Sequence, residues 1–188
     1  MSTPGEPVPP IASARLDLVS LPVAFMEAVL AGETAAAEAI LGSRIPEGWS
    51  DTVSDLFRYR LGQLKSDPTQ LQWLARAMVL RDRDRTVIGH IGFHGPPDER
   101  GMVEVGYTVM PDYRRQGYAR EAVLALFDWA GREHGITLFR ASVGPWNEPS
   151  LGLVRSLGFQ QTGVQWDDVD GEELVFEVVI PRPGAAAG

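Results

Sequence analysis

The sequence predicts an α+β domain built around a mixed sheet. Two observations support this fold class. Apolar and polar residues alternate as in β-strands through the middle of the chain, and residues 119–130 then carry an apolar stripe with helical spacing. The expected order is one strand, helices, three antiparallel strands, a long helix, a strand, a short helix and two strands.

The first half of the chain is expected to form a strand followed by helices. Residues 15–20 alternate between apolar and polar types, as in a strand. Residues 22–32 and 33–42 have the alanine, leucine and glutamate content of short helices, and each ends at a glycine. Asp51 is the expected N-cap of a third helix that extends to Lys65.

The rest of the chain is expected to supply most of the strands. Residues 75–80 and 86–93 predict an antiparallel hairpin across a charged turn, and residues 102–110 predict a third strand. The elements expected after the long helix are a strand, a short helix and a terminal hairpin, at residues 138–143, 149–157, 159–166 and 174–180.

Length and composition predict one compact domain. The chain has 188 residues, of which 44% are hydrophobic and 22% are charged. We expect the domain to span residues 14–181, between a disordered, proline-rich tail at residues 1–13 and a flexible tail at residues 182–188. Prolines interrupt the N-terminus where a secretory signal needs an apolar run, and no apolar stretch approaches the roughly 20 residues of a membrane span. A cytoplasmic location without membrane attachment is therefore expected.

The charge balance excludes some partners. Lys and Arg number 17 against 25 Asp and Glu, a net charge of −8, so we expect no nucleic-acid partner and prefer a cationic one such as an amine. Cysteine is absent and histidine occurs three times, which argues against disulfides, a thiolate nucleophile or a metal site. His90 and His94 alternate on one predicted strand face and are expected to pack rather than bind metal.

The most informative segment is residues 109–119, because it leads from a strand into the longest helix. The first N–H groups of a helix lack intrahelical acceptors, and together with the helix dipole they form an anion site. Gly117 allows close approach of a phosphate, and Arg114 and Arg115 add positive charge. Neither the Lys-Ser/Thr pair of a nucleotide–magnesium loop nor the third glycine of a dinucleotide turn is present. A diphosphate without magnesium fits better; the alternative is a basic surface turn.

Several motifs in order resemble the GCN5-related N-acetyltransferase (GNAT) superfamily over roughly residues 15–180. The motifs are Arg114-x-x-Gly117-x-Ala119, Val109-x-Pro111 before it, and Asn147-x-x-Ser150 and Leu157-Gly158-Phe159 after it. The segment Glu104-Val-Gly-Tyr107 is most similar to the ribosomal-protein N-terminal acetyltransferase (RimJ/RimL-like) branch. The resemblance implies the GNAT fold, a mixed, mostly antiparallel central sheet with splayed central strands, flanked by helices.

The resemblance also implies acetyl-CoA as co-substrate, without a metal, between the strands at residues 102–110 and 138–143. The implied cofactor-binding residues are Tyr107, Val109, Arg114, Arg115, Gln116, Gly117, Tyr118, Ala119, Asn147 and Ser150. Loop amides would hold the pyrophosphate, and the main chain at Tyr107 and Val109 would pair with the pantetheine arm. Asn147 suits equally well the N-cap of a helix, and Ser150 could be an ordinary first-turn residue.

Amide formation requires removal of a proton from an ammonium group before the amine attacks the thioester. Glu104 is the first candidate base, because it lies on the strand face opposite the valines; the alternative is an exposed strand glutamate. Asp167 and Asp168 are rival bases or plain turn residues. Many relatives protonate the thiolate with a tyrosine where this chain has Val154, so Ser150 or water would serve, or the thiolate leaves unprotonated.

The function implied is acetyl-CoA-dependent N-acetyl transfer to a primary amine, either a peptide amino terminus or a small-molecule amine. The alternative is a non-catalytic acyl-CoA-binding or sensing module. Aromatic and charged residues are candidate walls of the acceptor site or, alternatively, core residues: Trp49, Phe57, Tyr59, Arg60, Trp146 and Trp166. A homodimer through the terminal strands stays open.

Overall fold

The computed structural model describes residues 8–168 and 171–181. Its contacts divide the chain into two compact units, the first with residues 1–92 and 107–126 and the second with residues 93–106 and 127–188. The predicted single domain over residues 14–181 stays a prediction, and the C-terminal tail at residues 182–188 lies outside the described residues. No helix among the described residues is long and apolar enough to cross a membrane.

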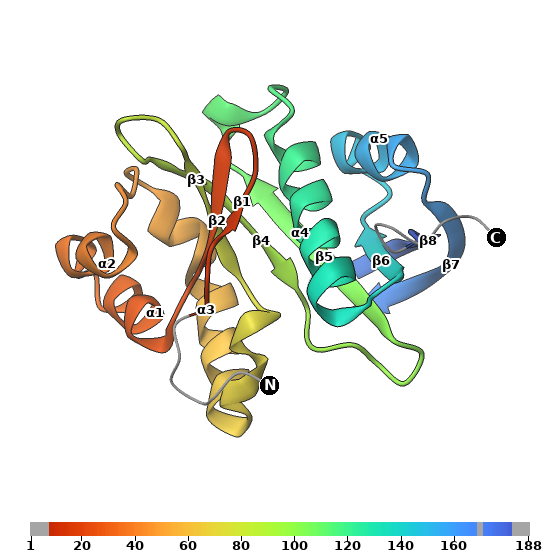
Figure 1. Ribbon diagram of the computed structural model, residues 1–188, viewed down its shortest axis with the longest axis horizontal. Coiled ribbons are helices and arrows are strands. Elements are labelled where there is room, and N and C mark those ends of the chain that lie inside the picture. The colour runs from red at the N-terminus through yellow and green to blue at the C-terminus, as the bar shows by residue number, and fades with distance from the viewer. Residues whose placement is uncertain (1–7, 169–170, 182–188) are drawn as a thin grey trace. The chain divides into compact units, whose positions relative to one another are not determined.

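The strands follow the order β1-β2-β3-β4-β5-β6-β8-β7 and the helices flank them, which confirms the predicted fold class (Figure 1). The elements are β1 (Ile11–Ala12), β2 (Leu16–Ser20), α1 (Val23–Leu30), α2 (Thr34–Leu41), α3 (Trp49–Ser66), η1 (Pro68–Gln72), β3 (Arg76–Leu80), β4 (Val87–Phe93), β5 (Met102–Val109), η2 (Pro111–Tyr113), α4 (Tyr118–His134), β6 (Leu138–Val143), α5 (Glu148–Ser156), β7 (Gln160–Asp167) and β8 (Gly171–Val179).

The core of the first unit lies between α1–α3 and the strands beside them (Figure 1). Three aromatic rings, of Phe25, Trp49 and Phe57, meet edge-to-face with centroids 5.9 to 6.2 Å apart. All three side chains are buried, and so is Arg60. Trp49, Phe57 and Arg60 therefore belong to the core, and only Tyr59 of the candidates in this region is exposed.

Helix α3 begins two residues before its predicted N-cap. Gly48 occupies the cap position with φ 77°, so the chain turns into the helix there, and Asp51 falls in the first turn. The Asp51 N-cap prediction is wrong because burial of Trp49, which is 1% exposed, fixes the helix start earlier than the capping pattern suggests. Asp51 still complements the positive end of the helix dipole.

Part of the proline-rich N-terminal segment belongs to the folded domain. Ile11 and Ala12 form β1, which pairs antiparallel with β2, and Ile11 is buried. Arg76 Nη1 donates to the Pro9 carbonyl over 3.1 Å. The predicted tail at residues 1–13 is therefore too long, because one buried isoleucine and main-chain pairing are enough to order residues 9–12.

The second unit contains β6, β8, β7 and the first part of β5. β6 and β8 pair antiparallel from Leu138↔Val179 to Val143↔Leu174. The parallel pairing of β5 with β6 extends only from Met102↔Leu138 to Glu104↔Arg140, although β6 continues to Val143. The central strands therefore part after Glu104, as predicted for splayed strands.

Candidate functional site

The loop before α4 is exposed and contains two residues with unusual backbone angles. Arg115 and Gly117 both have left-handed backbones, with φ 59° and 83°. At the start of α4 the Glu121 amide donates to the Gly117 carbonyl over 3.0 Å, so the amides of residues 118 and 119 precede the intrahelical bonds, and residues 114–117 are exposed. Successive N–H groups in such a conformation, at the positive end of a 17-residue helix, are typical of anion-binding sites.

Side chains within the loop brace its main chain. Arg114 Nε donates to the Val109 carbonyl over 2.8 Å, and Gln116 Nε2 donates to the Asp112 carbonyl over 3.0 Å. The Tyr113 amide closes the turn on the Met110 carbonyl over 2.9 Å. Arg114 and Gln116 thus hold the loop in shape.

Arg15 contributes to this site although no local sequence signal indicates it. Its Nη1 donates to the Gln116 carbonyl over 3.0 Å, and its guanidinium lies 4.3 Å from the centroid of the Tyr118 ring. Its Nε pairs with Glu121 Oε2 over 2.7 Å. The predicted loop therefore gains a third arginine, from the bend between β1 and β2 about 100 residues earlier in the chain.

Glu121 anchors Arg15 to the first turn of α4. Its Oε1 accepts hydrogen bonds from the Arg15 amide and from Ser13 Oγ, each over 2.7 Å. Burial raises the pKa of the Glu121 carboxyl, but the bonds from Ser13 and Arg15 outweigh that effect and hold the pKa below its usual range. The carboxylate therefore stays ionised and fixes Arg15 beside the loop.

The strand that enters the loop directs two amides away from β4. The Met110 amide donates to the Ile88 carbonyl over 2.9 Å. Because N–H directions alternate along a strand, the Tyr107 and Val109 amides point to the opposite edge. Gly89 of β4 lies so close to this segment that a Cβ there would overlap the Thr108 carbonyl oxygen.

Glu104 is held by its neighbours in the second unit. Ser142 Oγ donates to Glu104 Oε1 over 2.6 Å, and the carboxyl side chain is 19% exposed. His94 Nδ1 lies 3.8 Å from the same oxygen. Glu104 is therefore not a plain exposed strand glutamate.

The two predicted strand histidines differ in environment. His94 lies just past the end of β4 with its side chain 53% exposed, and His90 is partly buried with its Nδ1 enclosed. Burial, followed by the positive charge of Arg60, lowers the pKa of His90 to about 4. Within residues 8–168 and 171–181, no group of three or more His, Cys, Asp or Glu side chains could hold a metal ion.

Asn147 is the N-cap of α5, which was the alternative to a cofactor-binding role in the sequence analysis. Its Oδ1 accepts from the Ser150 amide over 3.2 Å. A cap engages the side-chain oxygen, so a cofactor contact by Asn147 would use its Nδ2 donor. Val154 is 2% exposed within α5, which places an apolar core residue where many relatives have a tyrosine.

The rival bases lie in the terminal hairpin. Asp167 is the last residue of β7 and pairs in register with Gly171, and Asp168 is exposed in the turn. Two tryptophans of this unit are highly exposed, Trp146 by 72% and Trp166 by 76%. Unlike Trp49 and Phe57, they are therefore available to a ligand.

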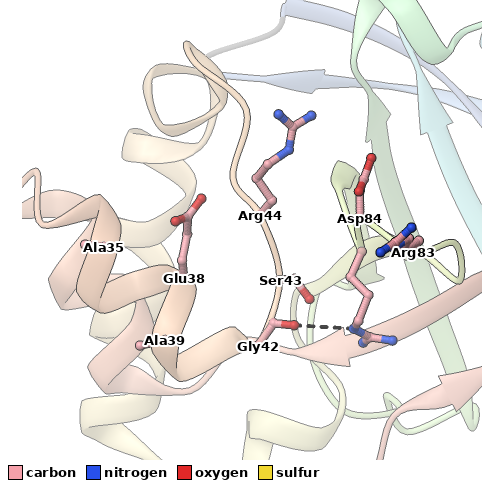
Figure 2. Close-up of a pocket in the computed structure, with 9 residues that line it drawn as sticks. Ala35, Glu38, Ala39, Gly42, Ser43, Arg44, Arg83 and Asp84 are labelled. Carbon is pink, nitrogen blue, oxygen red and sulfur yellow. Dashed lines mark hydrogen bonds between the residues drawn. The ribbon is translucent and has the colours of Figure 1, made fainter.

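An open depression in the first unit lies outside the predicted site. Its volume is about 520 Å³, and it is lined by α2 and the β3–β4 turn (Figure 2). Arg85, one of its lining residues, donates from Nε to the Gly42 carbonyl over 3.3 Å and pairs through Nη1 with Asp17 over 2.9 Å. None of the predicted cofactor or catalytic residues lines it.

Comparison with known proteins agrees with this geometry. The acetyltransferase (GNAT) domain model matches residues 30–160. The uncharacterized N-acetyltransferase p20 of Bacillus licheniformis is 34% identical over 91 residues, which cover 48% of this chain and 51% of that protein. The chain thus spans about half the length of the curated relatives it matches.

Solved structures show the same fold at low identity. An acetyltransferase from Agrobacterium tumefaciens has a TM-score of 0.61 and 22% identity, covering 96% of this chain and 99% of that one. RimL, a ribosomal L7/L12 alpha-N-protein acetyltransferase in complex with coenzyme A, has a TM-score of 0.63 and 16% identity, covering 93% and 99%. The fold is that of an acetyltransferase domain. The chain belongs to the GNAT family.

Proposed function

We propose that the protein is an acetyl-CoA-dependent N-acetyltransferase that transfers an acetyl group to a primary amine. The observation that carries this proposal is the exposed loop at residues 114–117, with left-handed backbones at Arg115 and Gly117, directly before the start of α4. Main-chain N–H groups at such a helix start match the charge and the acceptor oxygens of a diphosphate. Arg15 and Arg115 supply the neighbouring positive charge.

The pantetheine arm of the substrate would extend along the edge of β5 that points away from β4. The Tyr107 and Val109 amides are directed to that edge, so an extended arm can pair with them as an added strand does. A Val109 amide beside the thioester carbonyl stabilises the negative charge that develops on its oxygen. Asn147 Nδ2 and Ser150 Oγ are proposed as contacts on the opposite side of the arm.

Glu104 is the proposed general base. Its carboxylate accepts a proton from the acceptor ammonium, directly or through a water molecule. The neutral amine nitrogen then attacks the carbonyl carbon, a C–N bond forms, and the C–S bond breaks with its electron pair on sulfur. The nitrogen then releases its remaining extra proton as the amide forms, and this proton reaches the thiolate through Ser150 or a water molecule, because the buried Val154 offers no such group.

The acceptor is proposed to be a peptide amino terminus or a small-molecule amine in the cytoplasm. Exposed Trp146 and Trp166 can stack on an apolar or cationic group of the acceptor. The net charge of −8 attracts a cationic acceptor. RimL, similar in fold, bears a name that describes acetylation of a protein amino terminus.

A second candidate is a non-catalytic acyl-CoA sensor, favoured by Val154 in place of a tyrosine. Calorimetric binding of acetyl-CoA, combined with release of free CoA thiol from a panel of peptides and amines, separates the two. Binding with amine-dependent thiol release supports the enzyme. Binding without turnover on any acceptor supports the sensor, and no binding overturns both.

If the protein is an enzyme, Glu104→Gln tests the proposed role of Glu104 as general base. Turnover should fall by about 100-fold or more while affinity for acetyl-CoA is retained. Glu99→Gln, at an exposed turn position, is the matched control and should leave turnover unchanged. Undiminished turnover in Glu104→Gln would transfer the role to Asp167 or Asp168.

A further inference from the structure

Four polar side chains form one hydrogen-bonded row across the sheet of the second unit. Ser142 Oγ on β6 donates to Glu104 Oε1 on β5 over 2.6 Å. Gln165 Nε2 on β7 donates to Ser142 Oγ over 3.1 Å and to Glu173 Oε2 on β8 over 2.9 Å. Ser142 and Gln165 therefore link two carboxylates, those of Glu104 and Glu173.

The donors and acceptors allow one arrangement of hydrogens. An ionised Glu173 only accepts, so the amide nitrogen of Gln165, and not its oxygen, must face it. The same nitrogen has a second hydrogen, which it donates to Ser142 Oγ. Because Ser142 already accepts there, its own hydrogen is directed to Glu104. Glu173 thus fixes the orientation of the Gln165 amide, and Gln165 fixes the orientation of the Ser142 hydroxyl. Ser142 in turn fixes the orientation of the Glu104 carboxylate.

The register of the strands keeps this row in place. Gln165 and Glu173 are direct cross-strand partners. Main-chain pairing of β5 with β6 ends at Glu104↔Arg140, two residues before Ser142. The bond from Ser142 to Glu104 consequently ties the two strands by side chains where their main-chain ladder has stopped.

Two further charged groups lie near this row, Glu177 with its two arginine partners and His94 beside Glu104. Glu177 Oε1 pairs with Arg140 Nη2 over 2.9 Å and with Arg100 Nη1 over 3.2 Å. His94 Nδ1 is 3.8 Å from Glu104 Oε1, longer than a hydrogen bond. Ser142 is therefore the side chain with the shortest contact to the proposed base.

We propose that Ser142 and Gln165 are positioning residues, which hold the Glu104 carboxylate in the orientation that accepts the proton of the acceptor amine. This inference rests on the proposed role of Glu104 as general base. Gln165 cannot pass a proton along the row, because its amide hydrogens do not exchange roles with an acceptor. The row orients the base and does not conduct protons.

The test compares kcat and KM for a set of variants of the full chain. Ser142→Ala should lower kcat roughly tenfold or more, with KM for acetyl-CoA unchanged, because it removes a hydrogen bond to a charged group. Ser142→Thr keeps the hydroxyl and should restore most of the activity. Gln165→Leu should give a smaller loss, about three- to tenfold. Gln161→Leu is the matched control on the same strand, and its kcat should not change.

A second measurement tests the coupling. In a Glu104→Gln background, Ser142→Ala should change kcat by less than about twofold, because the group on which Ser142 acts is gone. In amide-side-chain NMR spectra, the two Gln165 hydrogens should be separately shifted, and Ser142→Ala should move one of them. Thermal unfolding of each variant checks that the sheet stays folded; if Ser142→Ala does not fold, Ser142→Cys replaces it.

The outcomes separate this inference from the proposed function. If Glu104→Gln lowers kcat but Ser142→Ala lowers it equally in both backgrounds, the positioning role is wrong and the base stands. If Ser142→Ala leaves kcat at the wild-type value, the positioning role is wrong as well. If Glu104→Gln has no effect on kcat, both the general-base role of Glu104 and the positioning role of Ser142 and Gln165 are wrong.

Discussion

Arg15 Nε and Glu121 Oε2 lie 2.7 Å apart although 106 residues separate them in the chain. The pair joins the turn before β2 to the first turn of α4, beside the loop proposed to hold the diphosphate. Its environment shields it from water on the glutamate side, where the side chain is 17% exposed. The pair therefore positions Arg15 more firmly than an ordinary surface ion pair does.

We expect Arg15→Ala to weaken acetyl-CoA binding about tenfold, because it removes a cation and a brace on the Gln116 carbonyl. Calorimetry measures the Kd. Glu121→Gln should weaken binding in the same direction, and Arg132→Ala, an exposed position later in α4, should not. Unchanged affinity in Arg15→Ala would show that the loop amides suffice alone.

Gly117→Val should abolish measurable binding of acetyl-CoA. The backbone at Gly117 has φ 83°, which a β-branched residue rarely adopts, and the new side chain would cover the loop amides. Gly62→Ala, where an added Cβ meets nothing within 4 Å, is the control. Retained affinity in a folded Gly117→Val protein would contradict the proposed diphosphate site.

His90 is expected to make the free energy of unfolding depend on pH below neutrality. Between pH 6.5, its ordinary pKa, and about 4, the unfolded chain binds a proton at His90 and the native chain does not. Native stability should therefore decrease as pH falls through this window, by at most about 3 kcal/mol from this residue, and the loss should level off below it. Urea unfolding at pH 7 and pH 4.5 measures the difference. His90→Gln should show a smaller difference than the wild type.

Arg76→Lys should destabilise the first unit by about 2 kcal/mol. Arg76 is fully buried and donates to three carbonyls, those of Pro9, Leu18 and Gln72. Burial lowers its pKa to about 10, so the guanidinium stays charged near neutral pH. A lysine ammonium is a single point of charge and cannot reach the three acceptors together. Urea unfolding checks this, with exposed Arg58→Lys as the control within about 0.5 kcal/mol.

Local sequence patterns are sufficient to predict the helices and strands in which apolar residues recur with a clear helical or strand spacing. The stripe at residues 119–130 falls inside α4, and the predicted hairpin matches β3 and β4 within a residue or two at each end. The position of the loop between β5 and α4 could be predicted because it separates a strand pattern from a helical stripe. In each case the signal lies within about 15 consecutive residues.

The parts that sequence analysis missed depend on contacts across the chain. Arg15 reaches the loop because β2 and α4 come together, and nothing near Arg15 in sequence indicates this. The row through Ser142 and Gln165 depends on register between strands, which turn residues and alternation do not determine. The start of α3 was misjudged because the burial of Trp49 outweighs the capping preference of Asp51.

The contact between Gly89 and the Thr108 carbonyl has a consequence for engineering. A larger residue at position 89 would push the end of β5 outward, and the loop that follows would move with it. To graft this loop onto another scaffold, one must therefore also keep a glycine at the position of Gly89, which lies on β4 and not on the strand that leads into the loop. The proposed diphosphate site therefore depends on β4 as well as on β5 and the loop, and not on one continuous peptide.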